Sequence, residues 1–176
     1  CAALDEAPRA VMAFCDSSAI DEKGAPVFDS YKPYYATTVG TLLDRDGVHE
    51  GAEFVTRCLG ERNLIMNASA VLFRRDALQA ALSRCEDLET LRVAGDWRLY
   101  VELLRTPEAQ VAYVAQPLHV HRPHSSSATG RLASEAHLSE IERVHQVIDL
   151  AAAQGDLQAR QSASRQEIAR QLALWD

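Results

Sequence analysis

The hydrophobic positions in the first part of the chain form short apolar runs that end in polar residues. Residues 11–15 (VMAFC) are followed by Asp16-Ser17-Ser18, the pattern of a buried strand in an α/β sheet that presents polar side chains at its carboxyl end. Ligands of open α/β sheets bind at such ends. Val27-Phe28 is expected to pair back as a short extended piece, and residues 29–48, rich in Tyr, Thr and Pro, to be irregular.

The middle of the chain alternates between helical and extended patterns. Residues 51–59 predict a short helix, residues 63–73 a buried extended segment, and residues 75–84 a second helix. A third helix is predicted over residues 95–105, because apolar side chains recur there at i, i+3, i+4 and i+7. These are Trp97, Tyr100, Val101 and Leu104.

The last third combines two predicted strands with a helical tail. Residues 111–115 and 118–122 predict strands separated by Gln116-Pro117, and residues 131–176 predict two helices that separate near residues 154–156 and pack as a hairpin. We therefore expect an α/β fold, with a sheet, flanking helices and a C-terminal helical hairpin. The predicted units are residues 1–130 and a helical extension over residues 131–176.

Composition narrows the classes of function. The 176 residues suit one globular unit, and the net charge of −7 argues against a protein that grips nucleic acid through its phosphates. The four cysteines have no spacing typical of zinc sites or disulfides, which favours free thiols in the cytoplasm. No apolar run reaches the roughly 18–20 residues of a membrane-spanning helix. The first residue is Cys1, which suggests a portion of a longer protein.

Asp16 and its neighbours are the first candidates for chemistry. A carboxylate followed by two serine hydroxyls at a strand end offers oxygen ligands to a divalent cation, with Ser18 as the second protein ligand. The alternative is that Asp16 stabilises a turn by accepting a hydrogen bond from the backbone.

Asp96 is the second candidate, because the predicted helix places it at a helix N-terminus. Trp97 beside it could pack under a sugar ring or into the core. Simple helix capping is the alternative for Asp96. Asn67 and Ser69 lie in the apolar segment before the second helix, where they face a cleft or bond to the backbone.

Histidines cluster in and directly after the second predicted strand of the last third. Alternation puts His119 and His121 on one strand face, so a two-histidine metal site is one interpretation. The favoured interpretation places Arg122 and His124 at the start of a polar loop, where both can meet phosphate oxygens and His124 can also reach a metal.

Taken in order, four segments resemble the later portion of family 2 glycosyltransferases, inverting enzymes with the GT-A fold. The resemblance covers roughly residues 10–130 and rests on the order and spacing of the motifs. The segments are residues 14–24 (FCDSSAIDEKG), 67–75 (NASAVLFRR), 94–99 (AGDWRL) and 117–129 (PLHVHRPHSSSAT). Two positions depart from the family pattern. Ser18 replaces the second metal-motif aspartate, and Gly95 stands where many relatives have glutamate.

The resemblance implies a partial GT-A-like sheet and transfer of a sugar from a nucleotide-sugar donor to a glycan or lipid-linked acceptor. It implies Asp96 as general base, Mn²⁺ or Mg²⁺ held by Asp16, Ser18 and His124, diphosphate contacts from Arg122 and His124, and acceptor contacts from three further residues. Those three are Asn67, Ser69 and Trp97.

An isolated fragment without the upstream nucleotide-binding half is expected to be inactive. The full-length protein is expected to be cytoplasmic, with peripheral attachment to the inner membrane as a further option. The alternative function is a non-catalytic binding or assembly module, which forms a homodimer through the C-terminal helices.

Overall fold

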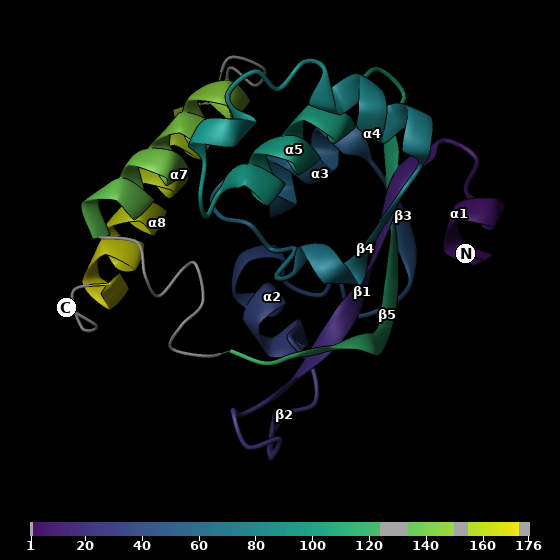
Figure 1. Cartoon of the computed structure of the whole chain (residues 1–176), viewed down its shortest axis with the longest axis horizontal. Helices are drawn as coiled ribbons and strands as arrows, with labels where there is room; N and C mark the ends of the chain where they lie inside the picture. Colours follow the sequence, from purple (N-terminus) through teal and green to yellow (C-terminus); the bar gives the residue numbers. More distant parts are fainter. Residues whose placement is uncertain (1, 124–133, 150–154, 173–176) are drawn as a thin grey trace.

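The computed structural model describes residues 2–123, 134–149 and 155–172. The chain forms an α/β fold, in which a mixed sheet has strand order β2-β1-β5-β3 and β4 also pairs with β1. Two long strands, β1 (Ala10–Ile20) and β5 (Gln110–His121), run parallel through its centre. Figure 1 shows them side by side, with helices α3 and α5 between them and the C-terminal helices.

The remaining elements follow the order of the chain. The strands are β2 (Pro26–Phe28), β3 (Gly47–Glu50) and β4 (Val71–Phe73). The helices are α1 (Ala2–Glu6), α2 (Lys32–Val39), α3 (Gly51–Cys58), α4 (Arg75–Leu82), α5 (Gly95–Leu104), α7 (Ser134–Asp149) and α8 (Gly155–Leu172). Short 3₁₀ turns η1 (Ala68–Ala70) and η2 (Leu88–Thr90) precede β4 and α5.

Most of the predicted elements are confirmed. The strand after residue 10, the helices that begin at Gly51, Arg75 and Gly95, and the paired C-terminal helices all form. The extended segment over residues 63–73 is wrong in part, because only β4 is a strand. The interpretation of residues 29–48 as irregular is also wrong, since α2 and the start of β3 lie within them.

The two strands predicted in the last third are one strand. The register of β5 against β1 shifts between Cys15 and Ser17, where Pro117 lies opposite Asp16. Proline has no N–H for the ladder, and a bulge accommodates it without ending the strand. Pairing resumes with His119 opposite Ser17.

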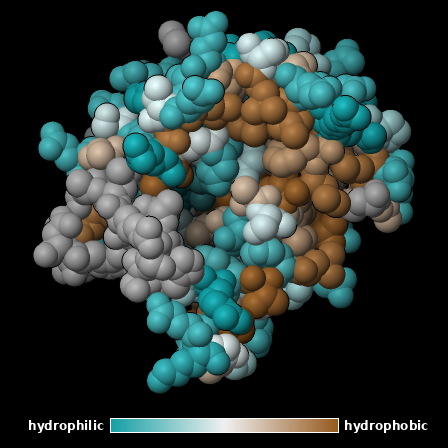
Figure 2. All heavy atoms as spheres, in the orientation of Figure 1, coloured by the Kyte–Doolittle hydropathy of each residue, from teal (hydrophilic) through white to brown (hydrophobic). Residues whose placement is uncertain are grey.

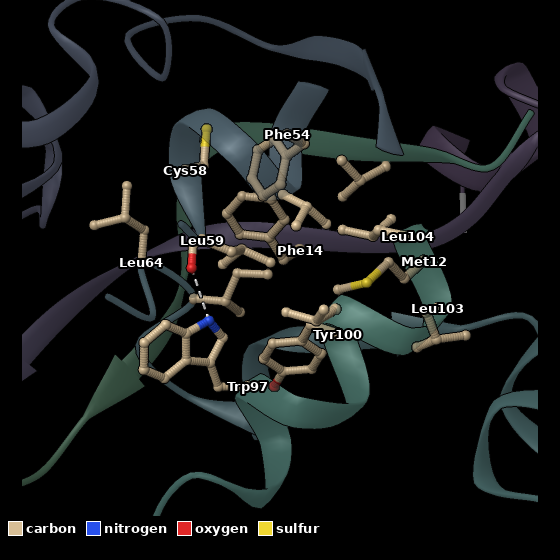
Figure 3. Close-up of a cluster of buried hydrophobic side chains, with 14 of the residues drawn as sticks. Met12, Phe14, Phe54, Cys58, Leu59, Leu64, Trp97, Tyr100, Leu103 and Leu104 are labelled. Carbon is tan, nitrogen blue, oxygen red and sulfur yellow. Dashed lines mark hydrogen bonds between the residues drawn. The ribbon is translucent and has the colours of Figure 1, made fainter. Parts of the chain in front are cut away.

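The core lies between the sheet and the helices α3 and α5. Figure 3 shows Phe14 from β1 against Phe54 from α3, whose ring centroids are 5.7 Å apart, and Tyr100 on α5. Gly51 is required where α3 meets the end of α5, because a β-carbon there would lie 2.2 Å from the carbonyl oxygen of Leu104. None of the helices in the described residues combines the length and hydrophobicity needed to cross a bilayer.

Candidate functional site at the end of the central strands

The parallel pairing of β1 and β5 brings polar residues together near the carboxyl ends of both strands. Ser17 lies opposite His119, Ser18 opposite Val120, and Ala19 opposite His121. Carboxyl ends of parallel strands meet at one edge of a sheet, so residues about a hundred positions apart in sequence become neighbours. We call Asp16, Ser17, Tyr31, Ser69, His119 and His121 the strand-end cluster.

His119 links three segments of this cluster. Its Nδ1 is 3.1 Å from the Ser17 hydroxyl, and its Nε2 is 2.9 Å from the Ser69 hydroxyl. A neutral imidazole has one donor and one acceptor nitrogen, so one serine donates to the ring while the other accepts from it. Ser17 is buried and Ser69 is exposed, and the ring therefore connects the interior of the sheet to the surface.

His121 has a different partner from His119. Its Nδ1 is 2.5 Å from the hydroxyl of Tyr31, which lies at the N-terminus of α2. The two histidines thus contact separate elements, η1 and α2. A site in which they share one metal would require His119 to leave one of its serines, because both of its ring nitrogens already have partners.

Asp16 is fully buried, at 0% exposure, and its carboxylate is committed to backbone and hydroxyl donors. Oδ1 accepts hydrogen bonds from the N–H groups of Ser17 at 2.8 Å and Tyr31 at 3.1 Å, and Oδ2 accepts one from the Ser30 hydroxyl at 2.5 Å. Asp16 therefore anchors the start of α2 from strand β1, and its backbone donors are Ser17 and Tyr31, not the residue two positions on that a capped turn would use. Burial raises the pKa of Tyr35, and the negative charge of Asp16 raises it further.

The carboxylate of Asp16, the first predicted ligand of a divalent cation, already accepts three hydrogen bonds from the protein. Magnesium and manganese need several oxygen ligands, and both oxygens of this carboxylate already accept hydrogen bonds. Ser18 is half-buried next to it. Over residues 2–123, 134–149 and 155–172, no three His, Cys, Asp or Glu side chains are grouped to hold a metal ion. His124, the third predicted ligand, lies outside the described residues.

Asp96 lies in the first turn of α5, as predicted, and is partly buried. Its Oδ1 accepts a hydrogen bond from the N–H of Trp97 at 2.6 Å. Burial raises the pKa of Asp96, although the backbone N–H groups of Trp97 and Asp96 itself act in the opposite direction. A carboxyl group with a raised pKa holds a proton more strongly than an ordinary aspartate and so is a better general base.

Trp97 packs in the core, with 3% of its surface exposed. The indole N–H donates to the carbonyl oxygen of Leu59 at 3.0 Å, as Figure 3 shows. The ring also meets the edge of His145 on α7, with centroids 5.3 Å apart. A ring held in this way has no open face for a sugar, so packing accounts for Trp97 in this structure.

Three further residues were predicted to contact a ligand, and they lie in different parts of the chain. Arg122 is exposed directly after β5. Asn67 is half-buried before η1, and its amide nitrogen has no hydrogen-bond partner among the described residues. Ser69 belongs to the strand-end cluster through His119. The structure thus links Ser69 to Ser17 through His119. Asp96 lies on α5 and is hydrogen-bonded to Trp97 of the same helix.

Sequence reasoning did not identify Ser30 and Tyr31 as parts of this site. The signal available was the aromatic run at 31–35 (YKPYY), with Pro33 in the first turn of a helix. The partner of these residues, Asp16, is 14 and 15 positions away, and sequence periodicity does not report such contacts. Comparison of the chain with known protein families, curated proteins and solved structures found no match.

Proposed function

We propose that the protein is a glycosyltransferase that moves a sugar from a nucleotide-sugar donor to a hydroxyl of a glycan or lipid-linked acceptor. The observation that carries the proposal is the meeting of three motifs at His119. Ser17 and Ser69 are 102 and 50 positions away from it, yet both contact its ring. These are three of the four segments on which the resemblance to family 2 glycosyltransferases rests, and their convergence at one edge of the sheet supports a shared ligand site.

Asp96, from the fourth segment, is assigned the role of general base. It removes the proton of the acceptor hydroxyl while that oxygen attacks the anomeric carbon from the face opposite the leaving group. The bond between the anomeric carbon and the diphosphate oxygen breaks, and the nucleoside diphosphate departs with that electron pair. The single displacement inverts the anomeric configuration. The raised pKa of Asp96 supports this role.

Cationic side chains after β5 are assigned to the departing diphosphate. Arg122 is exposed at the end of this strand, where its guanidinium can pair with two phosphate oxygens. His124 follows two positions later in the sequence. No step of this scheme depends on a cation at Asp16, whose two carboxylate oxygens accept hydrogen bonds from the protein.

Turnover of sugar nucleotides by the whole protein that the gene encodes tests the proposal. A panel of uridine, thymidine and guanosine diphosphosugars is incubated with the protein, and nucleoside diphosphate release is followed. Asp96→Asn is expected to reduce kcat by about 10²- to 10⁴-fold. Asp76→Asn is the matched control, because Asp76 also lies in the first turn of a helix but is exposed. Equal loss in both variants, or no turnover of any donor, would overturn the proposal.

A non-catalytic binding module is the second candidate, favoured by an apolar surface on the sheet. Leu72, Leu118 and Val120 are each more than half exposed, and the first two line a hollow of about 220 Å³ beside Ser69. Figure 2 shows apolar residues gathered over the region of β1, β4 and β5. Over residues 134–149 and 155–172 no large hydrophobic side chain is exposed, so the surface favours the sheet over the C-terminal helices as an interface.

Sedimentation velocity distinguishes these interfaces. A homodimer through the sheet dissociates in Leu118→Ser, whereas one through the C-terminal helices does not. A protein that remains monomeric at all concentrations, and that turns over a sugar nucleotide, supports the enzyme alone.

A further inference from the structure

The segment that leads into Asp96 is held by a carboxylate from a distant helix. Glu140 on α7 accepts three backbone hydrogen bonds, with Oε1 receiving the N–H of Arg92 at 2.8 Å. Its Oε2 receives the N–H groups of Val93 at 2.8 Å and Ala94 at 3.0 Å. Successive backbone N–H groups that converge in this way form an anion-binding concavity. Here the anion belongs to the protein and not to a ligand.

This arrangement is built into the interior of the molecule. Glu140 is only 7% exposed. Burial alone would raise the pKa of Glu140, but the N–H donors of residues 92–94 outweigh it, so that the pKa is lowered. The side chain is therefore a carboxylate at neutral pH, and the three hydrogen bonds are charge-assisted.

Two more side chains of α7 contact the same region of the chain. Arg143, one turn after Glu140, donates to the Thr90 hydroxyl at 2.8 Å and is 3.4 Å from Asp87. His145 packs its ring edge against Trp97, directly after Asp96. Helix α7 thus contacts the chain on both sides of Asp96.

Ala94 is both the last of the three residues bound by Glu140 and the N-cap of α5, the helix that carries Asp96 in its first turn. Ala94 donates its N–H to Glu140, and its carbonyl oxygen accepts the N–H of Arg98 in the first helical turn. A shift of residues 92–94 would therefore move the start of α5, and with it the Asp96 side chain. Figure 1 shows α7 and α8 packed together beside α5, at the side of the molecule away from β1.

We propose that Glu140 is a positioning residue for Asp96, and that α7 belongs to the catalytic unit. The proposal rests on the glycosyltransferase function for its reaction, and on the hydrogen bonds to residues 92–94 for its structure. It places the boundary of the functional unit beyond residue 130, where the sequence suggested that a separate helical extension begins.

The structural half of the proposal is tested by hydrogen exchange and carboxyl titration in Glu140→Gln. The amide group of glutamine presents one oxygen where the carboxylate presents two, so the backbone N–H groups of residues 92–94 are expected to exchange about tenfold faster or more. The pKa of Asp96, followed by carboxyl ¹³C NMR, is expected to fall towards its ordinary value as the loosened turn admits water. Glu142→Gln is the matched control, because Glu142 is on the same helix but exposed. Unchanged exchange and an unchanged Asp96 titration would overturn the proposal.

The catalytic half is tested by a double-mutant cycle. Glu140→Gln is expected to lower kcat by about 10- to 100-fold, with a smaller change in KM, because displacement of a catalytic group acts on the chemical step. In an Asp96→Asn background the same substitution is expected to have no further effect. An equal loss in both backgrounds would show that Glu140 acts on stability and not through Asp96.

The structural half and the catalytic half of the proposal can be overturned independently of each other. If the wild-type protein turns over no sugar nucleotide, the proposed function fails, while exchange at residues 92–94 still decides whether Glu140 positions Asp96. If Glu140→Gln does not fold, as seen by circular dichroism, Arg143→Gln loosens the same segment at Thr90 and is expected to shift the Asp96 titration in the same direction. No shift in that variant would overturn the proposal.

Discussion

The indole N–H of Trp97 donates a hydrogen bond to the main-chain carbonyl oxygen of Leu59, at 3.0 Å. This bond connects the first turn of α5 to the end of α3 inside the core. Trp97→Phe removes the donor, leaves the Leu59 oxygen without it, and opens space beside His145. We expect a loss of about 2 kcal/mol in the free energy of unfolding.

Urea unfolding checks this value. Val27→Ala is the control, because Val27 is exposed on β2 and should change stability by no more than about 0.5 kcal/mol. Equal stability of Trp97→Phe and the wild-type protein would show that Trp97 is free to serve another role, such as contact with an acceptor.

His145 predicts an acid-sensitive stability. Its Nδ1 accepts from Arg165 on α8 at 2.7 Å, and its Nε2 donates to the Glu61 carbonyl at 3.0 Å, so the folded chain requires the neutral ring. Burial lowers the pKa of His145 to about 4, with the charge of Arg165 acting in the same direction. In the unfolded chain the pKa returns to about 6.5.

The direction in which stability changes with pH follows from proton uptake by the unfolded chain. Between about pH 6.5 and about pH 4 the unfolded state binds a proton that the folded state does not, so this contribution to stability falls as the pH falls. The full effect is about 3 kcal/mol. His145→Gln stays neutral, and the difference between its stability and that of the wild-type protein should shrink towards low pH. A difference that is constant from pH 7 to pH 4 would contradict the assignment.

Ser17 and Ser69 give a matched pair around His119. Ser17 is 2% exposed, whereas Ser69 is open to solvent, although each contacts one nitrogen of the same ring. Ser17→Ala is expected to cost about 1–2 kcal/mol of stability, because a partly buried hydrogen bond to the ring is lost. Ser69→Ala should cost less than about 0.5 kcal/mol, since water replaces the hydroxyl. Thermal unfolding of both variants checks the ranking, and a reversed order would contradict the orientation of His119.

Manganese titration checks the carboxylate of Asp16. Both of its oxygens accept hydrogen bonds within the protein, so Mn²⁺ is expected to leave the amide NMR signals of Ser17 and Tyr31 sharp. Selective broadening of these signals, reversed by a chelator, would show that the carboxylate exchanges its partners for a cation. That result would support the predicted metal site of Asp16, Ser18 and His124.

Periodicity predicted the elements that carry their own pattern. Strand β1 was recognisable because an apolar run ends in polar residues, and α5 because four apolar side chains share one helical stripe. Helix α2 was not, because its sequence (KPYYATTV) is rich in aromatic and β-branched residues with weak helical preference. Its start is stabilised by Asp16, a residue on strand β1 that is 15 positions away.

The candidate site was predicted in its parts but not in its connections. The polar residues in the second halves of β1 and β5 were identified, and the parallel pairing that joins them depends on a register with a bulge at Pro117. The contact between Glu140 and residues 92–94 spans 46 to 48 positions and joins two segments whose local patterns are independent. Such tertiary contacts are set by packing and leave no periodic signal in the chain.

The stereochemistry of sugar transfer tests the central claim most directly. The whole protein is incubated with a donor that it turns over and with a hydroxyl acceptor, and the anomeric coupling constant of the new glycosidic bond is measured by ¹H NMR. We predict a product of inverted configuration that Asp96→Asn forms about 10²- to 10⁴-fold more slowly. A retained configuration, or product formation by Asp96→Asn at the wild-type rate, would contradict the assignment of Asp96 as general base.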